Sequence, residues 1–404
     1  MNDPRVMSIV QKAHHLAGPE FAKHVHPMAQ QSRDNLRRLQ GASTPRKVRE
    51  AQDLILKSHA SRVVSLVLSV RKKPWVTREW LEETASTLNP HRDCGESIKV
   101  EVKPKSSGEG FRLICKFGPK RRALHHLVSD IIVAKFGLEP VDFLRKGLGA
   151  DAASDHINKL VEEGYRYFIL SDLKDYYPSV QHSSVREALG LPESVMLNCV
   201  TVGADVSLSF LGDFPNSTTI QTLEGAVRMG LPQGSRASST IAGLLLGPVL
   251  REITSADRII VHGDDSAVAA RSMMEAGTLQ KALQGVLESH PAGPFRLKRC
   301  EIADIDVGFE FMKYRHKRDF LTRRVHRRPA ALSYWRYIQK VCDFVRADPT
   351  KHGVRRVAQY RRRWIQSFAR WRLYPHSKLF LWITTRDAIK ETMAEKAKAP
   401  EAPF

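Results

Sequence analysis

Cysteines are few in this sequence and far apart. The 404 residues include five, none of them in a CxxC pair: Cys94, Cys115, Cys199, Cys300 and Cys342. Such spacing supplies neither a disulfide framework nor a zinc cluster. We therefore expect buried or inert thiols, as in proteins of reducing compartments.

Long apolar stretches are also missing. No run of about 18 apolar residues occurs, and the N-terminus lacks the apolar core of a secretory signal peptide. The sequence thus predicts a soluble, cytoplasmic protein without a membrane partner. Its hydrophobic content of 42% is enough for packed cores, and 404 residues suit two or three subdomains.

Basic residues are abundant. Lys and Arg number 64 against 43 Asp and Glu, for a formal net charge of +21. Such an excess favours a polyanionic partner, because binding releases the counterions of the polyanion. Residues 311–378 hold 20 Lys and Arg but 3 acids, with Tyr360, Trp364 and Trp371 interleaved. This pattern suits a helical region that grips nucleic-acid phosphates, although charge runs also occur on solvated helical faces.

Hydrophobic periodicity predicts helices at both ends of the chain and a mixed centre. Residues 1–95 are helical and basic in character, and the chain is helical again beyond Pro329. Between them we predict two strands within 98–119, a buried strand over 165–173, strand and loop over 206–227, and a long helix over 236–253. A capping box from Ser184 to Glu187 predicts the start of another helix.

Two acidic clusters coincide with predicted strand ends. Asp172 follows the apolar run YFIL, and Asp264 and Asp265 lie at the tip of a predicted hairpin in VHGDDSAVAA. Taken singly, each cluster is also typical of a cap or a solvated turn. Phosphoryl transfer to a hydroxyl uses two divalent ions about 4 Å apart. Mg²⁺ prefers carboxylate oxygens, so acids converging from two elements would supply its site.

A glycine-rich segment lies between these clusters. In MGLPQGSRASSTIAG, residues 229–243, Gly230 and Gly234 flank a proline and a glutamine. This composition indicates either a tight loop that brings backbone close to a ligand, or a simple turn from strand to helix.

In order and spacing, DLKDYYPSV, GLPQGSRASS and HGDD resemble motifs A, B and C of reverse transcriptases, especially the bacterial retron and group II intron lineages. LPQGS followed by a small-residue helix is the most specific match. Residues 141–160 are similar to the segment that precedes motif A in this family, and residues 307–319 to the primer-grip hairpin after motif C. The matching segments cover roughly residues 100–320.

The resemblance implies a metal site at Asp172, Leu173, Asp264 and Asp265, with Asp265 adjoining the two principal ligands. The implied cofactors are two Mg²⁺ ions, with Mn²⁺ as a substitute. Joint occurrence of the three motifs favours this interpretation of the paired acids over a solvated turn.

The resemblance also implies a nucleotide site. Lys105 and Arg112 resemble the pair that grips the triphosphate, and Gln233 is expected near the incoming nucleotide. Lys298 is a candidate general acid for the pyrophosphate. Tyr177 follows Asp172 by five residues, where its ring would exclude a ribose 2′-hydroxyl, provided that the strand continues through DYYP. The structural alternatives are a packed aromatic residue for Tyr177 and a solvated basic hairpin for Lys105 and Arg112.

The implied fold is α+β, a right-hand polymerase with a helical N-terminal extension and a helical, basic thumb. We expect an extension over 1–95, fingers over 96–165, a palm over 166–312, a thumb over 313–390 and a disordered tail over 391–404. No room remains for a ribonuclease H or endonuclease domain.

The predicted activity is RNA-templated DNA synthesis from an RNA template, a nucleic-acid primer and deoxynucleoside triphosphates, in a retron-like or phage-defence system with a cognate non-coding RNA. An RNA-dependent RNA polymerase is the alternative. Gly263 favours it, since His262 and Gly263 replace the Tyr-Ala or Tyr-Met usual before the paired acids of reverse transcriptases. A catalytically degenerate, RNA-binding relative is the second alternative.

Overall fold

A computed structural model describes residues 3–105, 110–144, 148–212, 217–372 and 376–398. By internal contacts the chain divides into two units. The first comprises Met1–Asp142, Leu173–Ile253 and Leu283–Lys298, and the second comprises Phe143–Asp172, Thr254–Ala282 and Arg299–Phe404.

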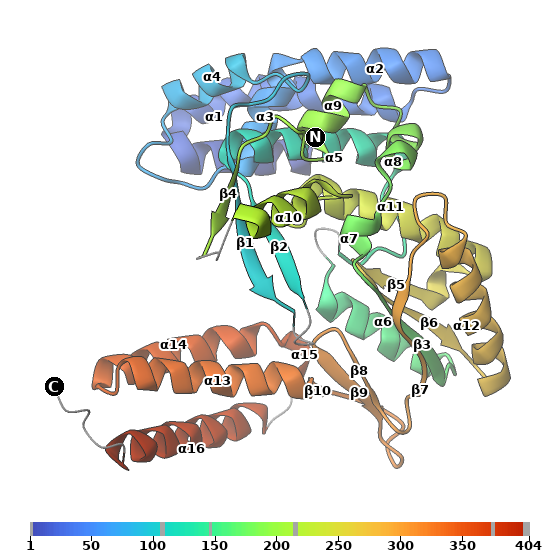
Figure 1. The fold of residues 1–404 in the computed structure, drawn as a ribbon, viewed down its shortest axis with the longest axis vertical. Helices are drawn as coiled ribbons and strands as arrows, with labels where there is room; N and C mark the ends of the chain where they lie inside the picture. Colours follow the sequence, from blue (N-terminus) through green and yellow to red (C-terminus); the bar gives the residue numbers. More distant parts are fainter. Residues whose placement is uncertain (1–2, 106–109, 145–147, 213–216, 373–375, 399–404) are drawn as a thin grey trace. The chain divides into compact units, whose positions relative to one another are not determined.

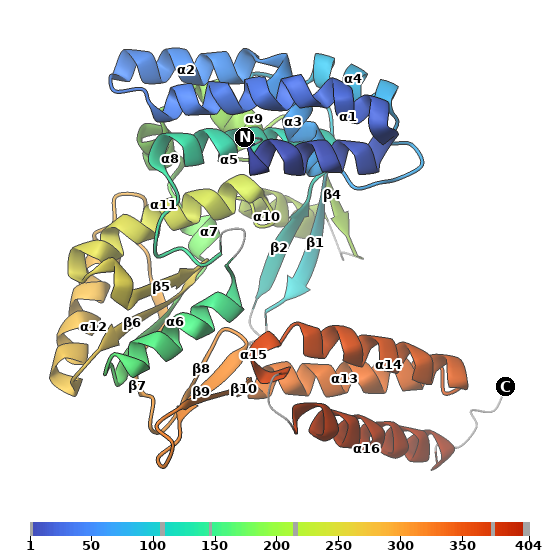
Figure 2. The same ribbon diagram turned by 180° about the vertical axis from the view of Figure 1, so that it is seen from behind.

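Helices dominate the first unit, and those before residue 95 confirm the helical prediction for the N-terminal region (Figure 1). They are α1 (Pro4–Gln40), α2 (Pro45–Lys57), α3 (His59–Ser69), α4 (Arg78–Thr87), α5 (Pro119–Phe136), α7 (Tyr176–Ser179), α8 (His182–Leu189), α9 (Glu193–Cys199), α10 (Ser217–Arg228) and α11 (Arg236–Ile253). Helix α3 packs against α1 and α5, and α11 packs against α5 (Figure 2).

A three-stranded sheet belongs to the same unit. Its strands are β1 (Ile98–Pro104), β2 (Phe111–Lys116) and β4 (Leu208–Leu211), in the order β2-β1-β4. The predicted pair of strands over 98–119 is confirmed as the antiparallel β1–β2 pair, whereas β4 runs parallel to β1. Most of the predicted Ser/Gly turn, 106–109, lies outside the described residues.

The second unit contains a four-stranded sheet with the order β5-β6-β3-β7. Its strands are β3 (Tyr167–Leu173), β5 (Ile259–His262), β6 (Asp265–Ala270) and β7 (Leu297–Asp304). The predicted buried strand and the predicted hairpin are thereby confirmed. Helix α6 (Ala150–Glu162) contacts β5, and its buried residues share a hydrophobic core with β3 and β6. The short helix η1 (Ala256–Arg258) precedes β5, and α12 (Met273–Glu288) follows β6.

A second sheet and a helical bundle complete this unit. The sheet has the order β10-β9-β8, from β8 (Phe309–Phe311), β9 (Tyr314–Arg318) and β10 (Val325–Pro329). The bundle consists of α13 (Ala331–Ala347), α14 (Lys351–Gln366), α15 (Ala369–Arg372) and α16 (Ser377–Lys398). The helical prediction beyond Pro329 is confirmed.

Three local predictions were wrong. Residues 217–228, expected as loop, form helix α10 after the short strand β4. The helix expected at HSSVREAL is confirmed as α8, but its Ser184 capping box does not form, because the Ser184 hydroxyl donates to the Pro291 carbonyl instead. The tail expected to be disordered from 391 is helical to Lys398, since its Ala, Glu and Lys residues have high helix propensity. Residues 399–404 lie outside the described part.

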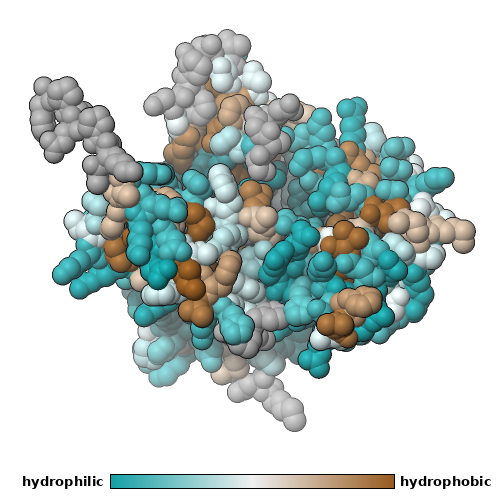
Figure 3. All heavy atoms as spheres, turned by 90° about the horizontal axis from the view of Figure 1, so that it is seen from below, coloured by the Kyte–Doolittle hydropathy of each residue, from teal (hydrophilic) through white to brown (hydrophobic). Residues whose placement is uncertain are grey.

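Hydrophilic side chains cover most of the face shown in Figure 3, and hydrophobic ones form small separate patches. Among the described residues, no helix combines the length and apolar character needed to cross a bilayer.

Candidate active site

Two of the predicted metal ligands face each other on one strand pair of the second unit. Strands β3 and β6 are antiparallel, and their register places Asp172 directly opposite Asp265. Directly opposed residues have Cβ atoms about 4.5–5.5 Å apart and lie on the same face of the sheet. The sequence spacing of the two motifs therefore folds into a facing pair of carboxylates.

Asp264 occupies the turn next to this pair. His262 pairs with Asp265, so Gly263 and Asp264 form a two-residue hairpin turn between β5 and β6. Gly263 has a φ of +71°, a conformation that residues with a Cβ rarely adopt. The glycine thus allows the tight turn that places a third carboxylate beside the facing pair.

The neighbouring ladder positions hold this geometry in place. Ser171 pairs with Ser266, and their buried hydroxyls are hydrogen-bonded at 2.5 Å. On the face shared by Asp172 and Asp265, alternate positions such as Leu170 and Ala267 are fully buried in the core with α6. Register is strongly specified here, because a slip of one residue would move every core side chain to the opposite face.

These donors fit Mg²⁺, which is hard and takes carboxylate and carbonyl oxygens. Asp172, Asp264 and Asp265 are half-buried, and Leu173, whose backbone is implied in metal binding, ends β3. Within the described part of the chain, no three or more His, Cys, Asp or Glu side chains are grouped closely enough to hold a metal ion by themselves. Mg²⁺ commonly binds through one or two carboxylates and completes its shell with water and substrate phosphates, which two facing acids allow.

Two residues near this pair were not predicted as site residues. Burial lowers the pKa of His262, with the Lys313 charge acting in the same direction and Asp264 opposing it, so the imidazole is neutral at pH 7. Lys313 lies in the β8–β9 turn and forms an ion pair with Asp151 at 3.1 Å. His262 stood out in the sequence as a departure from the motif. The hairpin expected over 307–319 is confirmed as a fold element, and its role as a primer grip remains a prediction.

In the first unit, the glycine-rich segment is a loop braced by backbone contacts. The Leu231 N–H donates to the Tyr177 carbonyl at 2.8 Å. Gly230 has a φ of +58°, and a Cβ there would lie far inside the van der Waals radius of that same carbonyl oxygen. The predicted tight loop is confirmed, and the backbone that it approaches belongs to the short helical turn α7; close approach to a ligand remains a prediction.

Gln233 connects the same loop to β2. Its carbonyl accepts a hydrogen bond from the Cys115 N–H at 2.8 Å, and it forms a parallel bridge with Ile114. A Cβ at Gly234 would lie 2.5 Å from the Cys115 carbonyl oxygen. Arg112, three residues before Cys115, is exposed on the same strand.

Lys105 is also tied to the motif A segment. It ends the described part of the β1 side of the hairpin, and its Nζ contacts Asp175 Oδ1 at 2.5 Å. Asp175 has a φ of +50°, which Asp tolerates better than most residues. This acid was not predicted as a site residue, although it is the second acid of DLKDYY.

Tyr177 requires a correction to its local structure. Strand β3 ends at Leu173, and Tyr176–Ser179 form a short helical turn instead of continuing the strand. Tyr176 fixes this turn, because it is fully buried and its hydroxyl donates to the Ala242 carbonyl at 3.0 Å. Tyr177 is half-buried beside it, with ring centroids 5.5 Å apart.

The predicted site residues therefore fall into two sets. Asp172, Asp264 and Asp265 belong to the second unit, and the first unit holds the rest: Lys105, Arg112, Leu173, Tyr177, Gln233 and Lys298. Lys298 is exposed near the start of β7, and the nearby Arg296 carbonyl accepts a hydrogen bond from the Lys174 N–H at 2.8 Å.

The aromatic residues of the basic C-terminal region have a different place from the one expected. Tyr360, Trp364 and Trp371 pack in the core of the helical bundle, where the Tyr337 and Trp364 ring centroids are 4.5 Å apart. Their spacing reflects helix packing rather than an exposed nucleic-acid surface. The basic residues remain outside, with Arg362 and Arg363 exposed on α14.

Comparisons with known proteins give a distant match. No family model matches the chain, and no curated protein matches it. Among solved structures, the chain is similar to telomerase from Candida albicans in complex with a TWJ fragment of telomeric RNA, with a TM-score of 0.36 and 13% identity. The match covers 78% of this chain and 62% of the telomerase chain, so less than two thirds of that protein is represented. A likeness this weak carries no argument about function.

The close contacts of Gly230 predict that adding a methyl group at this position lowers thermal stability. Gly230→Ala should lower the first thermal unfolding transition by several degrees, because its φ is unfavourable and the new Cβ collides with the Tyr177 carbonyl. Gly225→Ala is the matched control, since a Cβ there meets nothing within 4 Å in helix α10. Alanine is favoured over glycine in helices by about 1 kcal/mol, so this control should be neutral or stabilising. Equal melting curves for the two variants would contradict the packing described for Gly230.

Proposed function

We propose that this chain is an RNA-templated DNA polymerase that uses two Mg²⁺ ions. The observation that carries the proposal is the β3–β6 register, which sets Asp172 opposite Asp265 with Asp264 in the adjoining turn. When bound, the ions would lower the pKa of the primer hydroxyl and neutralise charge on the phosphates. The chain's own part is to hold the carboxylate oxygens at a fixed separation on a rigid ladder.

The residues of the first unit supply the remaining roles in this proposal. Lys105 offers a point charge and Arg112 a planar fork, a combination suited to a triphosphate. Lys105 is paired with Asp175, so nucleotide binding would exchange a carboxylate partner for a phosphate. Gln233 and Tyr177 would contact the nucleotide, and Lys298 would donate a proton to the pyrophosphate.

The lineage and biological role rest on sequence motifs. The order of DLKDYYPSV, GLPQGSRASS and HGDD supports a bacterial retron-like or group II intron-like enzyme. We include a cognate non-coding RNA and a role in phage defence within the proposal. Sequencing the nucleic acid that copurifies with the protein tests the first, and phage plating on cells with and without the protein tests the second.

An RNA-dependent RNA polymerase is the second candidate, favoured by Gly263. The positive φ of this residue supplies a structural reason for the glycine that is independent of the polymerase class. A degenerate, purely RNA-binding relative is the third candidate, and metal-dependent primer extension separates it from the other two.

The first test of the proposal removes one charge from each acidic motif. Asp172→Asn and Asp264→Asn should each abolish Mg²⁺-dependent nucleotide incorporation, because an amide is a much weaker ligand for a hard cation. RNA affinity should stay nearly unchanged, which a binding assay without divalent ions measures. Primer extension near the wild-type rate in either variant would rule out the metal assignment.

Selection of the sugar provides a second test. In Tyr177→Ala, discrimination against ribonucleotides should fall by at least about tenfold, at ~1.4 kcal/mol per tenfold, because the ring no longer occupies the volume of a 2′-hydroxyl. Tyr177→Phe keeps the ring and should keep the discrimination. The measurement is the ratio of kcat/KM for dGTP and GTP on one RNA template. A wild-type protein that prefers GTP would support the RNA polymerase instead.

The basic helix α14 is tested by salt dependence. Charge reversal at Arg361, Arg362 and Arg363 should flatten the log–log dependence of template–primer affinity on salt, because fewer phosphates release counterions. Affinity is measured by titration at several salt concentrations. An unchanged slope would identify this run as a solvated face without contact to nucleic acid.

A further inference from the structure

A concave surface that does not include Asp172, Asp264 or Asp265 lies within the second unit. A groove of about 1280 Å³ runs between the β9–β10 hairpin and the start of helices α13 and α16. Arg166, which lines it, directly precedes β3, whereas Asp172 lies six residues further along that strand. At about 3.3 Å per residue, the two ends of this segment are about 20 Å apart. The Arg166 end of the groove therefore lies well away from the carboxylate pair, and Asp172, Asp264 and Asp265 are not among the residues that line the groove.

One wall of the groove is a cationic face of the β9–β10 hairpin. The register pairs Arg315 with Arg328 and Lys317 with His326, all four lining the groove. Residues two apart on a strand share a face and are separated by about 6.8 Å. Like charges directly opposite one another destabilise a sheet, and a bound polyanion would remove that repulsion.

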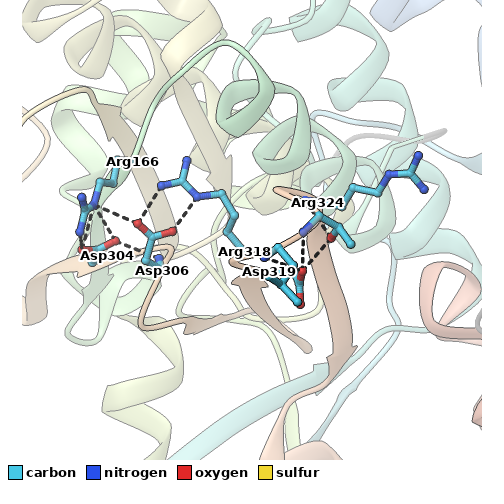
Figure 4. Close-up of polar contacts among 8 residues, drawn as sticks. Arg166, Asp304, Asp306, Arg318, Asp319 and Arg324 are labelled. Atoms are coloured by element: carbon cyan, nitrogen blue, oxygen red, sulfur yellow. Dashed lines mark hydrogen bonds and ion pairs between the residues drawn. The ribbon is translucent and has the colours of Figure 1, made fainter.

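Acids at one end of the groove are neutralised by their own arginines, as Figure 4 shows. Arg166 contacts Asp304 at 2.7 Å and Asp306 at 3.3 Å. Arg318 donates two hydrogen bonds to Asp306, at 2.6 and 2.7 Å. The hydrogen bonds from Arg318 lower the pKa of Asp306, so this carboxylate stays ionised and engaged.

The other two acids of the groove have structural roles. Asp319 accepts hydrogen bonds from the N–H groups of Leu321 and Thr322 and so shapes the β9–β10 loop. Glu310 accepts one from the Ala331 N–H at 2.8 Å, at the start of α13. These carboxylates are thus engaged by backbone donors.

Four cations of the groove remain without an ion pair in the described part of the chain: Arg315, Lys317, Arg323 and Arg328. The Arg315 Nε is buried and has no hydrogen-bond partner among the described residues. A buried guanidinium donor without a partner costs free energy unless a ligand accepts from it. The wall therefore offers positive charge that the protein itself does not neutralise.

Aromatic rings stand beside these cations. Phe320, in the β9–β10 loop, is 82% exposed, and the Arg323 guanidinium lies 5.6 Å from its ring centroid. On the helical side, Phe380 is 51% exposed and its centroid lies 5.7 Å from that of Tyr334. Exposed rings next to unpaired cations form the combination on which unstacked bases and their phosphates bind.

We propose that this groove binds an unpaired nucleic-acid strand at a site distinct from the catalytic carboxylates. A volume of about 1280 Å³ exceeds the ~300–1,000 Å³ typical of small-molecule sites, which favours a chain of nucleotides over a single small anion. The aromatic rings favour an unpaired strand over a duplex, whose bases are already stacked. The inference rests on the proposed function only in taking nucleic acid as the partner.

The test measures binding of a fluorescein-labelled 12-nucleotide oligouridylate RNA by anisotropy. It uses the full chain carrying Asp172→Asn, without divalent ions or nucleotides, so that the result does not depend on polymerisation. Adding Arg315→Ala and Arg328→Ala together should weaken binding by about tenfold or more. The log–log salt slope should become shallower by about 1.4, since each single-strand phosphate contact contributes about 0.7.

Phe320→Ala tests the stacking contribution separately. Its side chain is largely in solvent, so the variant should fold normally, which a melting curve verifies. Affinity should fall about fivefold, at the lower end of the effect of losing one base–aromatic stack, with the salt slope unchanged. Wild-type affinity in this variant would exclude a stacking role for the loop.

Arg46→Ala with Arg49→Ala is the charge-matched control, because both arginines are exposed on α2 and neither lines the groove. This pair should leave oligonucleotide binding unchanged. Equal losses in the control and groove variants, or an equal loss of blunt-duplex binding in the groove variants, would overturn the proposal. The two proposals can fail separately. If the wild-type protein extends no primer but the groove variants still bind the oligonucleotide more weakly than the Asp172→Asn parent does, the polymerase proposal is refuted and the groove proposal stands.

Discussion

The pairing of β3 with β6 is the constraint on which the candidate active site depends. It sets two carboxylates directly opposite each other, an arrangement that lowers stability when both are ionised. The buried hydrogen bond between Ser171 and Ser266 and the apolar core on the other ladder positions offset that repulsion. A divalent cation bound between two carboxylates would remove their repulsion. Binding of the cation would therefore also stabilise the folded state.

The same unit contains a second facing pair of like charges, and this pair is positive. On β9 and β10, Arg315 faces Arg328, while nearby acids are engaged by Arg166, Arg318 and backbone N–H groups. Local pairing of the acids leaves cationic charge on one face of the hairpin. The negative pair on β3 and β6 and the positive face of β9 and β10 therefore favour ligands of opposite charge. Metal ions suit the first, and the phosphates of a nucleic acid suit the second.

Periodic and motif-bearing segments could be predicted from the sequence, because their structure follows from local spacing. The strand over 167–173, the hairpin around Gly263 and the long helices all carried a clear hydrophobic period or a turn residue. Helix α10 could not be predicted, since its β-branched and small residues have no strong local preference and follow a loop-like stretch rich in Pro, Asn and Gly. The capping box failed because the Ser184 hydroxyl found a distant partner, Pro291, that no local pattern reveals. The aromatic residues of α14 were assigned to a ligand because packing and stacking draw on the same rings.

Within the first unit, one ion pair and several backbone hydrogen bonds connect the segments that carry most of the predicted nucleotide residues. Asp175, two residues before Tyr177, pairs with Lys105, the Tyr177 carbonyl accepts from Leu231, and the Gln233 carbonyl accepts from Cys115 on the strand of Arg112. Glycines at 230 and 234 permit these close approaches, since a Cβ at either position would collide with a carbonyl oxygen. Backbone contacts of this kind constrain residue size rather than residue chemistry. They explain why the segment GLPQGS, residues 230–235, requires its two glycines for folding.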